Sequence, residues 1–254
     1  MVQKPKYSGP NDKKHQPLDR SNTNKLERCA IEQDDVLNRL CVRVPLATGL
    51  RVGELVHLRP GTVDEAFSSD YDGVTWYVRI EPFAECIGGA GEIGQGNHTG
   101  GNPHDKGKPC SKCRDRSVEH KDWLSDEQKA TPGFSPKSIS SIEKYQWFLP
   151  GRDELAHDLK NIIELHGQFP ILSGAVNDRI AKVAKQAGID RPITAHGLRH
   201  TYGCRLGASA EFNIPRIMSY MRHSDPAMAV WYSEQWGERR RRALEDYSDP
   251  FTQE

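Results

Sequence analysis

Histidine, arginine and tyrosine recur at regular spacings near the carboxyl end of the chain. His196, Arg199 and His200 stand at positions i, i+3 and i+4, so on a helix all three can project from one face. Tyr232 follows His223 by nine residues, and its hydroxyl is a poor nucleophile until a neighbouring group removes or shields its charge. The pattern therefore indicates a tyrosine set among proton-transfer groups and a fixed cation.

Such a setting suits attack on a phosphodiester, because negative charge spreads over the non-bridging oxygens in the transition state. Guanidinium groups clamp such oxygens with forked hydrogen bonds. A second arginine, Arg51, lies in the segment Thr48–Leu55, three residues before Glu54, whose carboxylate is placed to hold the arginine side chain. In isolation, Arg51 would be read as a solvated surface charge.

These segments, in this order, resemble the tyrosine recombinase (phage integrase) family, in particular the catalytic domains of Xer-like and archaeal integrases. The resemblance is carried by Thr-Gly-Leu-Arg-x-Gly-Glu-Leu at 48–55, His-x-Leu-Arg-His at 196–200, and the pair His223 and Tyr232. It covers residues 26–247, with one long interruption. It implies an α+β, mainly helical fold: a tyrosine-recombinase catalytic domain with a small β-hairpin sheet and an inserted Cys-containing loop.

The resemblance also implies an enzyme, a site-specific DNA recombinase or integrase that cuts and rejoins DNA through a 3′-phosphotyrosyl intermediate. The tyrosine would attack a DNA phosphate held by two arginines and His223, while His196 assists proton movement and His200 supports the helix. Double-stranded DNA and a homo-oligomer assembled on it are the implied partners, and catalysis needs no cofactor. The implied catalytic residues are Arg51, Lys137, His196, Arg199, His223 and Tyr232.

The catalytic lysine has two candidates. In the family, a lysine on a β-hairpin protonates the departing 5′ oxygen, and a positioned general acid commonly contributes ~10²–10⁴-fold. Lys137 fits this position best, because it opens the segment that ends in Leu149-Pro150, and Lys144 is the alternative. For each of them, an exposed hairpin lysine without a catalytic part is the other reading.

Hydrophobic periodicity predicts the elements that position these residues. Apolar residues at 37, 40, 41 and 44 predict a helix that begins after Asp34 or Asp35 and is strained or ended near Pro45. Alternation predicts a strand at 74–80, with a hairpin partner formed by residues 134–138 and then 145–150. Further helices are predicted at 53–58, 152–166 and 173–187, and from starts near Thr194, Asn213 and Ser224.

The predicted organisation is one catalytic domain at 26–247, with an insertion at 88–133, between a disordered polar tail at 1–25 and a short tail at 248–254. The beginning of the chain is too poor in apolar groups to repay the entropy of ordering. Related recombinases carry a helical core-binding domain before the catalytic domain, and we expect none here.

The insertion contains Cys110 and Cys113, whose Cys-x-x-Cys spacing is typical of a zinc knuckle. A zinc ion here would be structural, since so polar a loop has little core of its own. Spacing alone does not select the two further ligands. The candidates are Cys86, His98, His104 and His120.

The 35 basic and 35 acidic residues give zero net charge, so bulk charge does not indicate a nucleic-acid partner. Residues 196–242, however, hold eight arginines and four acidic residues, which predicts a local basic surface for phosphate contacts. No apolar run approaches the ~18 residues that cross a bilayer, and no hydrophobic signal region begins the chain, so we expect a cytoplasmic protein without a membrane partner.

Three other functions fit parts of the pattern. A type IB topoisomerase uses much the same pocket but religates the same strand. A DNA-binding relative without recombination activity would fit the missing core-binding domain. A metal-dependent hydrolase would use His196, His200 and His223, but no glutamate stands beside His196 and the arginines would repel a cation, so we rank it last.

Overall fold

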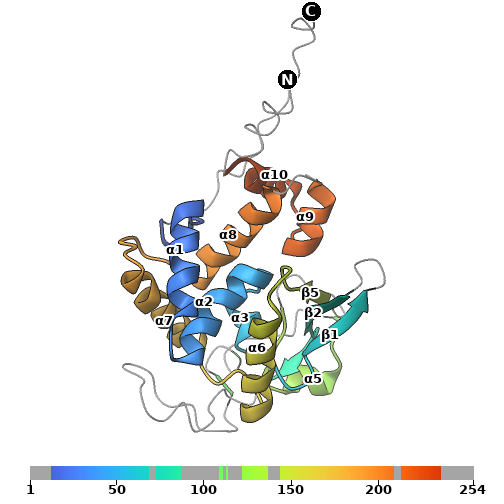
Figure 1. The fold of residues 1–254 in the computed structure, drawn as a ribbon. Coiled ribbons are helices and arrows are strands. Elements are labelled where there is room, and N and C mark those ends of the chain that lie inside the picture. Colours follow the sequence, from blue (N-terminus) through green and yellow to red (C-terminus); the bar gives the residue numbers. More distant parts are fainter. Residues whose placement is uncertain are drawn as a thin grey trace, which may run out of the picture.

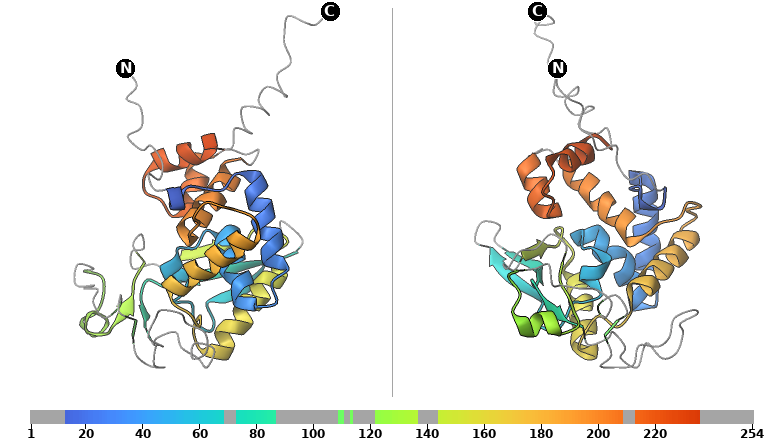
Figure 2. Two further views of the ribbon diagram at one scale, coloured as in Figure 1. Left: turned by 90° about the vertical axis from the view of Figure 1, so that its left-hand side faces the viewer. Right: turned by 180° about the vertical axis from the view of Figure 1, so that it is seen from behind.

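The computed structural model describes residues 13–68, 73–86, 109–110, 113, 122–136, 144–208 and 213–235. A group of packed helices forms most of this structure, and a small antiparallel sheet lies to one side of it (Figure 1, Figure 2). The fold is therefore mainly helical with a small β component, as the sequence predicts.

Helix α2 (Val36–Thr48) lies at the centre of the helical group. Asp35 begins it as predicted, because its carboxylate accepts a hydrogen bond from the backbone N–H of Leu37. The expected end near Pro45 is wrong: the helix runs on to Gly49, whose φ is 66°. The residues that follow the proline are buried, and their packing outweighs the backbone donor that the proline lacks. Four helices pack against α2, namely α1 (Arg20–Ile31), α6 (Asp153–His166), α7 (Ser173–Gln186) and α8 (Ala195–Gly207).

The main sheet consists of β1 (Val63–Ser68), β2 (Gly73–Ile80) and β5 (Lys144–Trp147), antiparallel in the order β1-β2-β5. Strands β2 and β5 confirm the predicted pairing with residues 145–150, whereas β1 is absent from the prediction. Two short strands between β2 and β5 along the chain, β3 (Ala84–Glu85) and β4 (Gly133–Phe134), pair separately. The other predicted part of the partner is wrong at Phe134, which pairs with β3 instead.

The later helices match the predicted ones closely. Helix α6 (Asp153–His166) and helix α7 are the two scaffold helices. The hydroxyl of Thr194 accepts from the backbone at the start of α8, and the side chain of Asn213 does the same for α9 (Ile214–Met221). Helix α10 (Pro226–Gln235) carries the tyrosine. Helix α3 (Val52–Leu55) is shorter than the predicted 53–58.

Residues 13–25 are folded, so the prediction of a disordered tail at 1–25 is wrong for this part. A 3₁₀ helix, η1 (Lys13–His15), and the first turns of α1 occupy the segment, and Leu18 is buried. The guanidinium of Arg191 donates hydrogen bonds to three of its carbonyls. These belong to Lys13, Gln16 and Pro17. Tertiary contacts thus supply the stabilisation that the local composition lacks.

Several predicted features lie outside the described residues. They are the tail at 1–12, most of the insertion at 88–133, the tail at 248–254, Lys137, and the candidate ligands His98, His104 and His120. The described part of the insertion includes α5 (Asp126–Ala130), whose first turn Ser125 caps. Among the helices that the structure describes, none is long and apolar enough to cross a membrane.

The Gly49→Ala substitution should destabilise the fold more than Gly167→Ala. Both glycines end a helix with positive φ, 66° and 73°, where an alanine costs about 1 kcal/mol. Only at Gly49 would the new Cβ meet a neighbour, 2.4 Å from Cδ1 of Tyr202, whereas nothing lies within 4 Å at Gly167. We expect about 2 kcal/mol more loss of unfolding free energy for Gly49→Ala, measured by denaturant titration. Equal losses would contradict this packing.

Candidate active site

Arg199 lies at the centre of the site, on α8, with 1% of its surface exposed. Its guanidinium donates hydrogen bonds to two backbone carbonyls, that of Gly49 after α2 and that of Met221 at the end of α9. The same guanidinium lies 3.3 Å from Nε2 of His223. Arg199 therefore ties the ends of two helices to the turn that carries His223.

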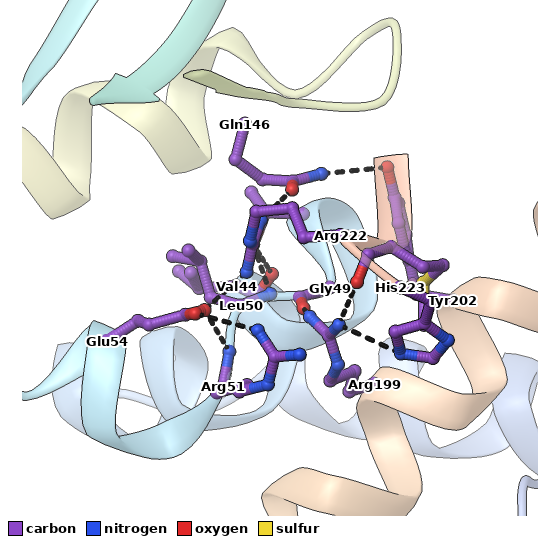
Figure 3. Close-up of polar contacts among 12 residues, drawn as sticks. Val44, Gly49, Leu50, Arg51, Glu54, Gln146, Arg199, Tyr202, Arg222 and His223 are labelled. Atoms are coloured by element: carbon purple, nitrogen blue, oxygen red, sulfur yellow. Dashed lines mark hydrogen bonds and ion pairs between the residues drawn. The ribbon is translucent and has the colours of Figure 1, made fainter. Parts of the chain in front are cut away.

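Glu54, on α3, is a buried carboxylate that two further arginines share (Figure 3). Its Oε1 accepts a hydrogen bond from Nη1 of Arg51 at 3.0 Å, and its Oε2 accepts one from the Arg51 backbone N–H at 2.7 Å. The same Oε2 accepts from the guanidinium of Arg222, in the turn after α9. Arg51 keeps 25% of its side chain exposed, so this guanidinium is within reach of a ligand.

Charge in this arginine cluster, which consists of Arg51, Arg199 and Arg222, is unbalanced. Burial, together with the charges of Arg51 and Arg222, lowers the pKa of Arg199 to about 9. Burial alone would raise the pKa of Glu54, but the three guanidiniums lower it overall. Three cations thus meet one described carboxylate in a setting of low dielectric. Such an excess of positive charge favours an anionic ligand.

Arg222 is a site residue that the sequence prediction counted as part of a basic surface. Its side chain is only 5% exposed, and its Nη1 donates to Oε1 of Gln146 on β5. Gln146 in turn donates from Nε2 to the hydroxyl of Tyr202 at 3.2 Å. Arg222 is also the only non-glycine residue of the described chain with positive φ, 47°. That conformation costs about 1 kcal/mol or more, which the side-chain contacts offset.

The predicted basic surface is therefore smaller than the count of arginines indicates. Besides Arg199 and Arg222, Arg205 is taken up in an ion pair, with Glu27 at 2.6 Å. The run at 239–242 lies outside the described residues. The partners of Arg222 come from distant segments of the chain. The only sign in the sequence that Arg222 belongs to the site is therefore its position directly before His223.

Tyr232, on α10, packs against α8 with 1% of its surface exposed. Its hydroxyl lies 2.7 Å from Nδ1 of His200. Gly203 permits this approach, because a Cβ there would lie 2.7 Å from Cε1 of the tyrosine ring. His196, expected at the nucleophile, instead packs edge-on against His200 with 4.4 Å between ring centroids. The histidine at the hydroxyl is thus His200, to which the prediction gave only a supporting part.

Two histidines of the site are neutral at pH 7. Burial, His196 and Arg199 lower the pKa of His200 to about 3. Burial, Arg199 and Arg51 likewise lower the pKa of His223 to about 3. Because a guanidinium only donates, the neutral His223 ring accepts at Nε2 and carries its proton on Nδ1. This Nδ1 is buried and has no hydrogen-bond partner among the described residues.

Lys144, the alternative to Lys137, opens β5 two residues before Gln146. Side chains two apart on a strand lie on the same face. Since Gln146 contacts Arg222, Lys144 lies on the face of β5 that meets the arginine cluster. Lys137 itself is outside the described residues.

A separate cluster, the thiol cluster, consists of His57, Cys86, Cys110 and Cys113. One ligand atom from each residue lies within 4.8 Å of the others. The structure thus brings together the predicted Cys-x-x-Cys pair and one of the suggested partners, Cys86. It adds His57, which the prediction missed because this residue lies far from the insertion in sequence. Any of these four residues is suited by type to hold a metal ion.

The structure is thus a helical domain with a small sheet, in which a tyrosine lies beside clustered arginines and histidines. Residues 148–238 match the model of the Phage integrase family. The matched region extends from the end of β5 through α6 to α10, and so includes Arg199, His223 and Tyr232. This part of the chain is therefore similar to the Phage integrase family.

Three kinds of solved structure share the fold. XerA recombinase is 15% identical with a TM-score of 0.52, over 95% of this chain and 68% of its own. XerH recombinase bound to palindromic difH substrate is 11% identical with a TM-score of 0.55, over 96% and 56%. The Tn1549 transposon integrase in complex with transposon right end DNA is 15% identical with a TM-score of 0.52, over 94% and 68%. The chain thus spans little more than half of XerH. No curated protein matches it in sequence.

The stability of the domain should fall as the pH drops below about 6.5. His200 has a pKa of about 3 in the folded chain and about 6.5 when unfolded, so between these values the unfolded state binds more protons. This histidine contributes stability above pH 6.5 and loses it toward pH 3, at about 1.4 kcal/mol per pH unit. Urea titrations from pH 7 to pH 5 measure the slope. The His200→Gln variant should flatten it, and an unchanged slope would contradict the assignment.

Removal of the shared carboxylate should leave the arginine cluster without its counter-charge. We expect Glu54→Gln to lose about 3–5 kcal/mol of unfolding free energy, because buried guanidiniums are then unpaired. Added sulfate should restore more stability to this variant than to the parent chain. Glu164→Gln, on the exposed side of α6, is the matched control. A Glu54→Gln midpoint equal to that of the control would contradict the role of the carboxylate.

Proposed function

We propose that this chain is a site-specific DNA recombinase or integrase that cuts and rejoins DNA through a 3′-phosphotyrosyl intermediate. The observation that carries the proposal is the pairing of the arginine cluster, which has one shared carboxylate, with a tyrosine hydroxyl 2.7 Å from a neutral histidine. A phosphodiester supplies the missing negative charge, and the tyrosine supplies the nucleophile. The structurally similar XerH recombinase is bound to its palindromic difH substrate, and the Tn1549 integrase is in complex with transposon right end DNA, which agrees with this proposal.

In the proposed reaction, the arginines and His223 hold the phosphate. Arg51 and Arg199 clamp the non-bridging oxygens, where charge builds up in the transition state. His223 donates from its unpartnered Nδ1 to the same phosphate. Arg222 adds positive charge to the site, and its hydrogen bond orients the Glu54 carboxylate. The carboxylate in turn holds the guanidinium of Arg51 in position. No metal ion or nucleotide is needed, since the phosphoester energy is kept in the covalent link.

Two proton transfers complete the proposed step. Tyr232 Oη forms a bond to phosphorus as the bond from phosphorus to the 5′ oxygen breaks. The tyrosine proton passes to Nδ1 of His200, and His196 assists this movement from its place beside the His200 ring. Lys137 or Lys144 protonates the departing 5′ oxygen. A second strand with a free 5′ hydroxyl reverses these steps, so that strands are exchanged.

The proposal also concerns partners and location. Strand exchange between two DNA sites needs several protomers, so we propose a homo-oligomer that assembles on double-stranded DNA in the cytoplasm. The structural zinc predicted at Cys110 and Cys113 belongs to the same proposal, as a brace that takes no part in the chemistry.

The alternatives are weighed by the same contacts. A metal-dependent hydrolase is disfavoured, because His200 is occupied by Tyr232 and the histidines of the site lie among guanidiniums. Among the described residues, the thiol cluster is the group suited to a metal ion, and it does not include these histidines. A topoisomerase-like activity and a DNA-binding relative without recombination activity remain for experiment to separate.

A trapping assay tests the proposal. Nicked duplexes with a randomised core are incubated with the full chain without added divalent metal, and a denaturation-resistant protein–DNA adduct is sought. The short fragment beyond the nick diffuses away after cleavage, so the adduct accumulates. We expect an adduct with the parent and with the control Tyr220→Phe, and none with Tyr232→Phe. Arg199→Ala should lower its rate by about 10²–10³-fold.

The other outcomes separate the alternatives. An adduct formed by Tyr232→Phe would remove this tyrosine as the nucleophile. An adduct on single duplexes that religates only to its own strand would favour a topoisomerase. DNA binding that weakens with salt but yields no adduct would favour a relative that only binds DNA.

A further inference from the structure

The thiol cluster joins segments that are far apart in the sequence. His57 lies two residues after α3, Cys86 directly follows β3, and Cys110 and Cys113 come from the insertion. All three cysteines are buried, at 3%, 6% and 4% exposure, and none forms a disulfide. Among the residues that the structure describes, the other apolar side chains packed against them are Phe134 and Leu172. Among the described residues, the cysteines themselves are thus the core of this part of the molecule.

The spacing of the ligand atoms fits a single tetrahedral ion. Zinc bonds of about 2.3 Å to sulfur and about 2.0 Å to nitrogen place neighbouring ligand atoms roughly 3.5–3.8 Å apart. In the structure, Nε2 of His57 lies 3.3 Å from Sγ of Cys113 and 4.0 Å from Sγ of Cys110. Three soft thiolates and one imidazole in this arrangement suit zinc.

The ring of His57 is oriented as metal-binding histidines are. Its Nδ1 donates a hydrogen bond to the backbone carbonyl of Gly53 at 2.6 Å, so the lone pair of a neutral ring is on Nε2, which faces the thiols. Phe134 stacks on the ring with 4.4 Å between centroids and an interplanar angle of 6°. These two contacts fix the imidazole before any ion binds.

The cysteines are also arranged in the manner of a knuckle. The backbone N–H of Cys113 donates to the carbonyl of Cys110 at 3.0 Å, which holds the two cysteines together. The backbone N–H of Cys110 donates to Sγ of Cys86 at 3.3 Å, a contact that stabilises negative charge on sulfur. The backbone of Cys86 is itself held by the carbonyl of Pro132.

We propose that His57, Cys86, Cys110 and Cys113 form one structural zinc site, which fastens the insertion to α3. His57 lies three residues after Glu54, the carboxylate that Arg51 and Arg222 share. The zinc ion would therefore hold α3 between the thiols on one side and the arginine cluster on the other. This consequence for the arginines rests on the proposed function, but zinc binding does not.

Metal content and cobalt spectra of the full chain test the ligand set. The protein is purified under reducing conditions, and we expect one zinc ion per chain. Cobalt exchanged into the parent should give the intense charge-transfer band of three thiolates and the visible bands of a tetrahedral ion. His57→Gln and Cys86→Ser should lose the zinc. Cys29→Ser, on α1, and the combined change of His98, His104 and His120 to Gln should keep it.

Several results would overturn the proposal. They are a parent chain that binds neither zinc nor cobalt, a cobalt spectrum without thiolate bands, or zinc kept by His57→Gln and Cys86→Ser. The parent spectrum decides the matter even where a variant fails to fold. Hydrogen exchange should speed up across α3 after chelation and recover with zinc. These measurements need no DNA. A failed trapping assay would therefore contradict the proposed recombinase activity and leave the proposed zinc site unaffected.

Discussion

One shared carboxylate decides how the site is built. Glu54 partly balances three guanidiniums that would otherwise repel one another inside the protein. Buried ion pairs gain little stability, because desolvation cancels most of the attraction. The main effect of the arginine cluster is therefore to make the site electrostatically positive, and its contribution to the stability of the fold is small. In the proposed reaction, an incoming phosphate would meet oriented donors that need no further reorganisation, which is the condition under which electrostatic catalysis is strongest.

Helix α8 connects the arginine cluster to Tyr232. Three of its residues make the contacts. Arg199 donates to the carbonyls that end α2 and α9, the ring of His200 hydrogen-bonds the Tyr232 hydroxyl, and the hydroxyl of Tyr202 accepts from Gln146 of the sheet. Gly203 then leaves room for the ring of Tyr232. Such a helix is buried nearly all round, so its folding and the assembly of the site are the same event.

Local signals explain what the sequence predicts well. Thr194 and Asn213 begin helices through contacts three residues away, and these are visible in the sequence. The roles of residues whose partners are distant in the sequence cannot be predicted in this way. Arg222 reads as a surface charge because Glu54 and Gln146 lie far off in sequence, and His57 gives no sign of the cysteines it meets. The ordering of residues 13–25 depends in the same way on Arg191. The order of the motifs indicates a resemblance to a family, whereas the contacts in the structure show which histidine lies at the Tyr232 hydroxyl.

The chain leaves the sheet after Ile80 and returns at Lys144, and these two residues are partners in the β2–β5 ladder. In the topology of the sheet, the whole segment 81–143 therefore takes the place of a hairpin turn between β2 and β5. The entropy of closing a loop grows only slowly with its length, by about 0.6 kcal/mol for each doubling. Segments of very different size can therefore be exchanged at this point during evolution without a shift of strand register. The tip of this hairpin is thus a point at which a domain of this fold can gain an additional segment while the packing of its helices and the register of its sheet are kept.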